Sequence, residues 1–342
     1  MISAEKSNIN GNITILNNNK PHSIIANPNV IHCSNRCSIT NINTISLITS
    51  AFEENRHSNQ LIENIREKHI HFKNIKQKNF TNADKIKLLA RSVKLESRKL
   101  NINNITITVD DKNVINNSDI TMTKLNGIKA FHLTDNNLQN SIPSRNARLT
   151  IDHNSAINSK YSSFKIENGI FNNAGTLASN QDSHYKIING EFYNNGTINN
   201  IEMLVITGIN ANIDNQSKIK AKNNYFLIKN GKFNNRGKIK NTELIEIFAD
   251  NSNINNQSEI KSKNGIDEIK NGQFYNSDII DHSEKMTING NNDYINNQFI
   301  LTSAKYDLTE LKFSNFLNFS FVLPYKRNSN NNVELDFSDN VM

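Results

Sequence analysis

The chain has 342 residues, of which 36% are hydrophobic and 21% charged, and its formal net charge is +7 at pH 7. This hydrophobic share lies below the ~45–50% of typical globular domains, but the abundance of Ile argues against disorder. Lys is interleaved with Glu and Asp, so the positive charge predicts no nucleic-acid partner. No stretch reaches the ~18 apolar residues that a membrane-spanning helix needs, so we predict no transmembrane segment.

The N-terminal segment is rich in Asn and contains Pro21 and Pro28, without an apolar stretch. We therefore predict no signal peptide in the chain as it stands. Cys33 and Cys37 follow, and they allow either a disulfide or two free thiols. A metal site is disfavoured because no second Cys pair or His partner has the right spacing.

His69 and His71 flank Ile70, so on a strand both would lie on the same face. Two His residues on a surface strand are more often solvated than bound to a metal, and we expect the same here. Residues 58–72 also allow a helix, and the sequence leaves this alternative open.

Two N-terminal segments, 24–49 and 83–109, carry recognisable phrases. The first contains an Ala-Asn-Pro-Asn phrase and the cysteine pair, and its relevant residues are Ala26, Asn27, Pro28, Asn29, Ile31, Cys33, Cys37, Asn41, Leu47 and Thr49. The second contains Leu-Leu-Ala-Arg-x-Val-x-Leu, at Leu88, Leu89, Ala90, Arg91, Val93 and Leu95. Both phrases resemble the secretion domain of the filamentous-haemagglutinin, or two-partner-secretion, exoprotein family.

The resemblance implies a partial secretion domain over residues 1–120, truncated at its N-terminus and itself a β-helix. It also implies that periplasmic modules of an outer-membrane transporter recognise the unfolded domain. Asn27, Pro28 and Asn29 are the candidate residues for this recognition, or for the fold that supports it. The chain departs from the family pattern at Val30 and Asp110, where Gly is usual, and in its Cys-x-x-x-Cys spacing.

The second half of the chain contains a repeat of about 20 residues. The phrase Asn-Gly-X-Phe begins at Asn189, Asn230 and Asn271, and a second phrase begins at Asn215 and Asn256, each with a step of 41 residues. Aligning the large apolar residue of every unit gives anchors that step by 20 or 21: Phe171, Phe192, Ile213, Phe233, Ile254, Phe274 and Ile295. The 41-residue period is thus a pair of units.

An Asn stands two positions after every anchor, at Asn173, Asn194, Asn215, Asn235, Asn256, Asn276 and Asn297. Leu or Ile stands six positions after the first six anchors, at Leu177, Ile198, Ile219, Ile239, Ile260 and Ile280. A leucine-rich repeat needs an L-x-x-L-x-L spacing that is missing, and helix pairs need 30 or more residues per unit. A unit of this length suits one coil of a parallel β-helix.

Coils stacked at ~4.8 Å would bring equivalent residues into register. The Asn side chains would then form a ladder of amide hydrogen bonds, and the anchors a continuous core. We predict an all-β fold: a right-handed, single-stranded parallel β-helix with about 20 residues per coil and a structural Asn ladder. Transition coils are expected in 121–165, regular repeats in 166–300, and a C-terminal cap or tail in 301–342.

The sequence predicts no catalytic residue, no metal and no cofactor. Polysaccharide lyases with a β-helix fold need carboxylates that converge on Ca²⁺ beside a basic residue. The recurring residue here is neutral Asn, and Asp214, Asp278 and Asp281 do not recur in register. No nucleophile–His–acid pattern stands out.

The repeats also resemble the haemagglutinin repeats of the same family, with their F-N-N-x-G-x-I phrase. The resemblance implies a non-catalytic surface adhesin, secreted or held at the bacterial cell surface, or a truncated product that is not exported. Its partners would be the two-partner-secretion transporter and a host or neighbouring cell. The stalk of a contact-inhibition toxin or haemolysin without its toxic region is the alternative, and a carbohydrate-active enzyme is the third.

Overall fold

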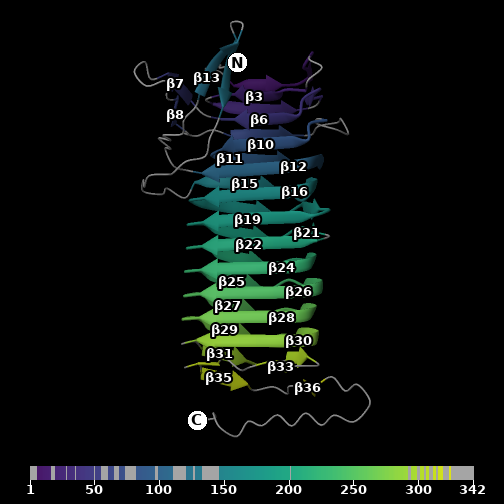
Figure 1. Ribbon diagram of the computed structural model, residues 1–342, viewed down its shortest axis with the longest axis vertical. Coiled ribbons are helices and arrows are strands. Elements are labelled where there is room, and N and C mark those ends of the chain that lie inside the picture. Colours follow the sequence, from purple (N-terminus) through teal and green to yellow (C-terminus); the bar gives the residue numbers. More distant parts are fainter. Residues whose placement is uncertain are drawn as a thin grey trace.

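The computed structural model of the protein is a right-handed parallel β-helix, in which successive coils stack along one axis (Figure 1). The structure describes residues 6–16, 20–27, 29–34, 36–49, 51–54, 61–64, 69–73, 82–96, 99–110, 121–125, 128–132, 146–200, 202–291, 294–298, 301–303, 306–307, 311–312, 315–318 and 323–324. Every regular element in these ranges is a strand, so the predicted fold class is confirmed.

One sheet of 13 parallel strands runs the length of the β-helix. Its strands are, in spatial order, β1 (Ser7–Ile9), β4 (Val30–Ser34), β9 (His69–Lys73), β11 (Ser92–Glu96), β15 (Ala147–Ile151), β17 (Gly169–Asn173), β20 (Glu191–Asn194), β23 (Asn212–Asn215), β25 (Lys232–Asn235), β27 (Asn253–Asn256), β29 (Gln273–Asn276), β31 (Tyr294–Asn297) and β35 (Asn315–Asn318). Phe171 pairs with Phe192, and Phe192 with Ile213, so each predicted unit is one coil.

The other sides of the coils are formed by a second set of parallel strands. These are β3 (His22–Ala26), β6 (Thr44–Ile48), β10 (Lys85–Ala90), β12 (Lys99–Asp110), β16 (Ala156–Glu167), β18 (Thr176–Ser179), β19 (Asp182–Ile188), β21 (Thr197–Asn200), β22 (Met203–Ile209), β24 (Ile219–Lys229), β26 (Ile239–Asp250), β28 (Ile260–Lys270), β30 (Ile280–Asn291), β32 (Leu301–Ser303), β33 (Tyr306–Asp307), β34 (Leu311–Lys312) and β36 (Leu323–Pro324). A short sheet of β2 (Asn12–Thr14) and β5 (Ser38–Thr40) completes the first coils.

Two antiparallel hairpins interrupt the N-terminal coils. The first consists of β7 (Ala51–Glu54) and β8 (Leu61–Asn64), and the second of β13 (Thr121–Leu125) and β14 (Ile128–His132). Figure 1 places both beside the N-terminal part of the β-helix. The parallel pairing nevertheless continues from β4 through β9 and β11 to β15. The predicted domain boundaries stay a prediction.

The core consists of side chains stacked in columns along the axis. The rings of Phe171 and Phe192, on successive coils, stack at 4.6 Å between centroids, and those of Phe226 on β24 and Phe233 on β25 pack against each other across the core at the same distance. A second column is formed by Leu177, Ile198, Ile219, Ile239, Ile260 and Ile280, each at most 2% exposed. Each fully buried side chain of this size contributes about 1.5–3 kcal/mol, and the repeat supplies one to every coil.

The C-terminal segment 301–342, predicted as a cap or tail, contributes to a further coil. Strand β35 pairs with β31, with Phe316 opposite Ile295 and Asn318 opposite Asn297. The anchor and Asn positions therefore continue one coil past the seven found in the sequence. Among the described residues there is no helix that could cross a membrane.

Candidate functional site

The predicted Asn ladder is present and fully buried. Six hydrogen bonds, each from Nδ2 of one Asn to Oδ1 of the next, link Asn173, Asn194, Asn215, Asn235, Asn256, Asn276 and Asn297 at 2.7–2.8 Å. All seven residues are at most 1% exposed. Each inner amide uses its oxygen toward the preceding coil and its nitrogen toward the following one, so the ladder has a single direction.

The ladder begins at Asn173, on the first coil that carries the repeat. Asn173 has Ile151 as its register partner on the preceding coil, and Leu95 stands opposite Ile151. Within the described residues, the buried Oδ1 of Asn173 has no hydrogen-bond partner, because no amide precedes it. The N-terminal coils therefore carry apolar side chains at the position that the later coils fill with Asn.

A second Asn ladder, which the sequence analysis missed, lies at another turn. Its members stand three positions before the anchors and have φ between 49° and 53°: Asn168, Asn189, Asn210, Asn230, Asn251 and Asn271. Asn tolerates this left-handed conformation better than most residues. Four bonds run from Asn251 back to Asn168, and Asn168 donates to Asp110 at 3.0 Å. The Asn of the Asn-Gly-X-Phe phrase was the available signal.

The candidate secretion motif lies in a tight turn between β3 and β4. Asn27 is fully buried, and its Oδ1 accepts the backbone N–H groups of Asn29 at 2.7 Å and Val30 at 3.2 Å. Its Nδ2 donates to Ser7 Oγ on β1. Asn29 is exposed, and Pro28 lies outside the described residues. The contacts of Asn27 are those of a residue that holds the turn.

Cys33 and Cys37 are joined by a disulfide and are both buried. The bond spans the turn between β4 and β5. Cys33 points into the core, where Ile9 and Phe72 are its register partners on the adjacent coils. The sequence had left a disulfide and free thiols as alternatives.

His69 and His71 lie on a strand, not a helix, and both side chains are on its outer side, because Ile70 and Phe72 point into the core. The His71 and His32 rings stack at 5.0 Å. Across the described residues, no group of three or more His, Cys, Asp or Glu is arranged to hold a metal ion.

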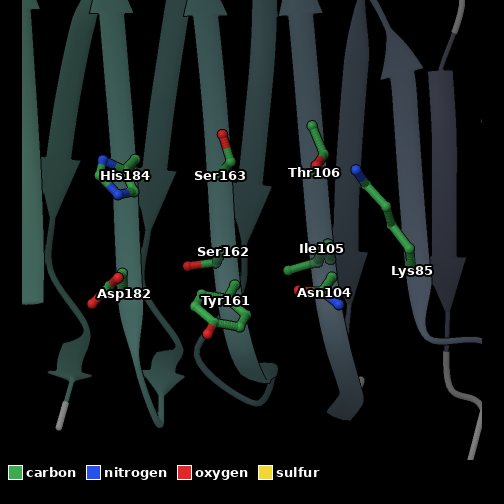
Figure 2. A pocket seen from close by; sticks show the side chains of 9 residues that line it. All are labelled: Lys85, Asn104, Ile105, Thr106, Tyr161, Ser162, Ser163, Asp182 and His184. Carbon is green, nitrogen blue, oxygen red and sulfur yellow. The ribbon is translucent and has the colours of Figure 1, made fainter. Parts of the chain in front are cut away.

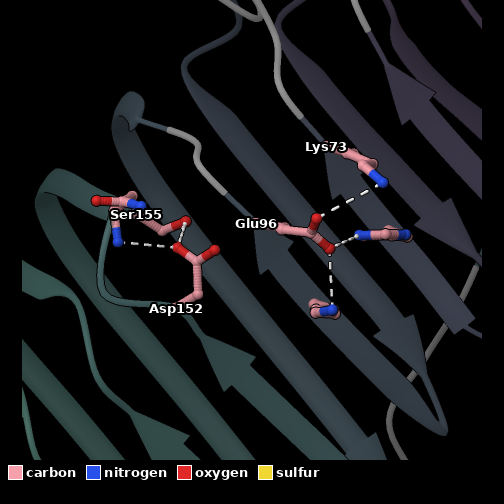
Figure 3. Close-up of polar contacts among 7 residues, drawn as sticks. Lys73, Glu96, Asp152 and Ser155 are labelled. Atoms are coloured by element: carbon pink, nitrogen blue, oxygen red, sulfur yellow. Dashed lines mark hydrogen bonds and ion pairs between the residues drawn. The ribbon is translucent and has the colours of Figure 1, made fainter.

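Glu96 lies close to two Lys side chains and one His side chain on the same outer surface (Figure 3). Its carboxylate lies 2.9 Å from Lys94 Nζ, 3.1 Å from His71 Nε2 and 3.6 Å from Lys73 Nζ. The hydrogen bond from Lys94 lowers the pKa of Glu96 to about 2. Burial lowers the pKa of His71 and outweighs the attraction of Glu96, so a neutral His71 is expected at neutral pH.

An open groove of about 410 Å³ crosses the outer surface of β10, β12, β16 and β19 (Figure 2). One row of its side chains follows the register from Lys85 to Asn104 and Tyr161, and Figure 2 shows Asp182 in line with them. Thr106, Ser163 and His184 form a second row. No local pattern in the chain indicated this groove, because its residues come from four coils and a hairpin lies between the second and the third.

Two ionisable side chains are buried within the coils of β28 and β30. Asp267 is 3% exposed, its register partners are Ile247 and Ile288, and burial raises its pKa to about 7. His282 is 1% exposed, and burial lowers its pKa to about 4.

The hydrogen bonds of His282 define its tautomer. Ser262 Oγ lies 2.7 Å from Asn264 O and 2.7 Å from His282 Nδ1. The single hydroxyl proton must go to the carbonyl, which can only accept. His282 Nδ1 therefore carries the proton that it donates to Ser262.

These features define a class of protein, a β-helix with a polar outer surface and ladders of stacked amides. Comparisons with family models, with curated proteins and with solved structures found no match for the chain. The resemblance of its N-terminal phrases to a secretion domain therefore rests on the residues alone.

Proposed function

We propose that the protein is a non-catalytic surface adhesin of the two-partner-secretion type. The support comes from two features of one chain. The N-terminal phrases resemble a secretion domain, and the repeats that follow form the extended parallel β-helix implied by that resemblance.

The observation that carries the proposal is the continuity between these two parts. The turn held by Asn27 leads directly into β4, and β4 belongs to the same 13-stranded sheet as the repeat strands. A secretion segment of this kind would fold first outside the cell, and each later coil could then add to the previous one. Such stepwise growth suits a solenoid, in which every repeat contacts only its neighbours.

Two further features favour an extracellular, binding role. The disulfide between Cys33 and Cys37 is a bond that persists in oxidising compartments. The recurring polar residues are neutral amides that are buried and bonded to one another, which leaves them no role in acid–base chemistry. An adhesin needs a stable extended surface, and the ladder provides stability without reactive groups.

Export by a two-partner transporter tests the proposal. The full chain, given a periplasmic signal sequence, would be expressed with and without the outer-membrane transporter of a two-partner system. We expect the chain in the medium or on the cell surface only with the transporter. Purified chain should also bind to host or neighbouring cells.

Two variants separate recognition from folding. Asn29→Ala removes an exposed side chain but keeps the backbone N–H that Asn27 accepts, whereas Asn27→Ala removes the acceptor of the turn itself. If the motif is read by the transporter, Asn29→Ala lowers export several-fold while the purified variant keeps the wild-type melting temperature. Transporter-independent release of the wild-type chain would contradict the proposal.

A further inference from the structure

We propose that the groove shown in Figure 2 binds an extended, neutral oligosaccharide, with Tyr161 as the stacking surface and Lys85, Asn104, Asp182 and His184 as hydroxyl ligands. The inference rests in part on the proposed function. It deepens that function, because it assigns a ligand class and a binding site to the adhesin.

The shape of the groove favours a chain-like ligand. It is open, and its volume of about 410 Å³ falls in the range of ~300–1,000 Å³ that is usual for ligand sites. It spans four adjacent strands, which at ~4.8 Å per strand spacing corresponds to roughly 14 Å along the axis. A linear oligosaccharide can lie along such a surface, whereas a small compact ligand would leave most of it empty.

Tyr161 provides the apolar part of the site. It is 39% exposed and is one of two large hydrophobic residues that are exposed among those described, the other being Leu16 near the N-terminus. Lys160 Nζ lies 5.7 Å from the ring centroid, a cation–π distance that helps to hold the ring in place. A fixed, exposed aromatic ring suits the C–H face of a sugar, because one end of a Tyr is apolar and the other polar.

Three of the polar side chains around Tyr161 are free to bind a ligand, whereas Asn104 Nδ2 donates to Asp84 O at 3.2 Å and keeps its Oδ1 for a ligand. Within the described part of the chain, the side chains of Lys85, Asp182 and His184 form no hydrogen bond or ion pair with another residue. On the later coils, by contrast, acidic side chains pair with Lys across one coil, as Glu202 does with Lys222 at 3.4 Å and Glu243 with Lys263 at 3.3 Å.

The charge of the groove favours a neutral ligand. Lys85 and Asp182 lie toward its opposite ends, as Figure 2 shows, and their formal charges cancel. A polyanion would be repelled at Asp182 and a polycation at Lys85. A sugar hydroxyl both donates and accepts, so it can bond to a carboxylate, an amide or an ammonium group in turn.

The test measures binding of the purified full chain to linear neutral hexasaccharides, namely maltohexaose, cellohexaose, xylohexaose and chitohexaose, by isothermal titration calorimetry. We expect at least one to bind, and Tyr161→Ala and Asp182→Asn each to weaken its affinity tenfold or more. Tyr275→Ala is the matched control, because this Tyr lies on an outer surface of the later coils, outside the groove, and should leave the affinity unchanged. Melting temperatures of all variants verify folding.

The inference is overturned if none of these sugars binds the wild-type chain, or if both groove variants bind as well as the wild type. Binding restricted to sulfated glycans, and lost with added salt, would also overturn it, since it would indicate a cationic surface instead. Sugar binding by a chain that no two-partner transporter exports would uphold the site and contradict the proposed function. Cell adhesion without sugar binding would support the proposed function and contradict the assignment of the groove as a sugar-binding site.

Discussion

Asn215 Nδ2 donates a hydrogen bond to Asn235 Oδ1 at 2.8 Å, although the two residues lie 20 positions apart in the chain. Both side chains are at most 1% exposed, so neither amide can exchange its partner for water. The bond fixes the register of two coils. The same bond recurs in the coils on either side, so the ladder and the strand pairing stabilise each other.

Replacement of Asn235 by Leu should be strongly destabilising. The variant leaves Asn215 Nδ2 without an acceptor and Asn256 Oδ1 without a donor, and each buried orphan group costs about 1–3 kcal/mol. We expect a loss of about 2–6 kcal/mol in the free energy of unfolding, measured by urea denaturation. A solenoid need not unfold in one step, so the urea denaturation should be accompanied by a hydrogen-exchange measurement on the neighbouring coils.

Asn173→Leu is the control for this prediction. The substitution breaks one ladder bond and also removes the Oδ1 that has no partner, while Leu extends the apolar column of Ile151. Its cost should be clearly smaller than that of Asn235→Leu. Equal costs would mean that the amide chain contributes nothing beyond side-chain packing.

Asp267 should make the stability of the protein fall as the pH rises. Its folded-state pKa of about 7 lies above the ordinary value of 3.8, so the unfolded chain loses the proton first. The stability present below pH 4 is therefore lost progressively up to about pH 7, by about 4 kcal/mol at most. Asp267→Asn should abolish this loss, so the variant is more stable than the wild type at pH 8 and similar to it at pH 4.

Glu246→Gln serves as the comparison for Asp267→Asn, since Glu246 lies on the neighbouring strand with its side chain outward. Because Glu246→Gln keeps the Asp267 carboxyl, the stability of this variant should still fall between pH 4 and 7. An Asp267→Asn profile that parallels the wild type would show that the carboxyl is hydrated in solution.

His282 should produce the opposite trend over nearly the same pH range. Its folded-state pKa of about 4 lies below the ordinary 6.5, so stability is complete above pH 6.5 and falls as the pH drops toward 4. This window overlaps that of Asp267, so the measurement belongs in the Asp267→Asn background. There, adding His282→Asn should reduce the remaining acid-dependent decrease of the melting temperature between pH 6.5 and 4, of which His71, whose pKa burial also lowers, keeps a share.

Reduction of the disulfide should have a modest effect. Cys33 and Cys37 are separated by 4 positions, and a loop this short is worth about 2 kcal/mol in the chain-entropy account. In the double variant Cys33→Ala/Cys37→Ala, the N-terminal coils should unfold at a temperature a few degrees lower than in the wild type. The unfolding temperature of the ladder coils should be unchanged. Hydrogen exchange resolved by peptide distinguishes the two regions, and collapse of the whole β-helix would contradict this expectation.

The sequence predicted the repeat coils well because each coil carries the same residues at the same positions. Phe192 and Asn194 recur in equivalent form every 20 or 21 residues, and stacking at the strand spacing then requires the ladder and the core column. The fold class followed from the length of the unit together with the absence of the leucine-rich-repeat spacing.

The remaining features could not be read from such a pattern. The N-terminal coils place Leu95 and Ile151 where later coils have Asn, so their equivalence shows only in the pairing of strands. The groove depends on four coils that bring Lys85 and Asp182 to its two ends, with a hairpin between the second and the third of these coils. Nothing local in the chain marks either residue as part of a site.

The stacking of equivalent residues is the central claim, and paired cysteines test it most directly. Lys220 and Lys240 are register partners on adjacent strands with exposed side chains. A parallel strand spacing of ~4.8 Å lies within the Cα separations that a disulfide allows. Lys220→Cys/Lys240→Cys should therefore cross-link rapidly on mild oxidation of the folded protein, whereas Lys220→Cys/Lys238→Cys, two positions out of register, should not. Equal cross-linking of both pairs, or failure of the first, would contradict the β-helix described here.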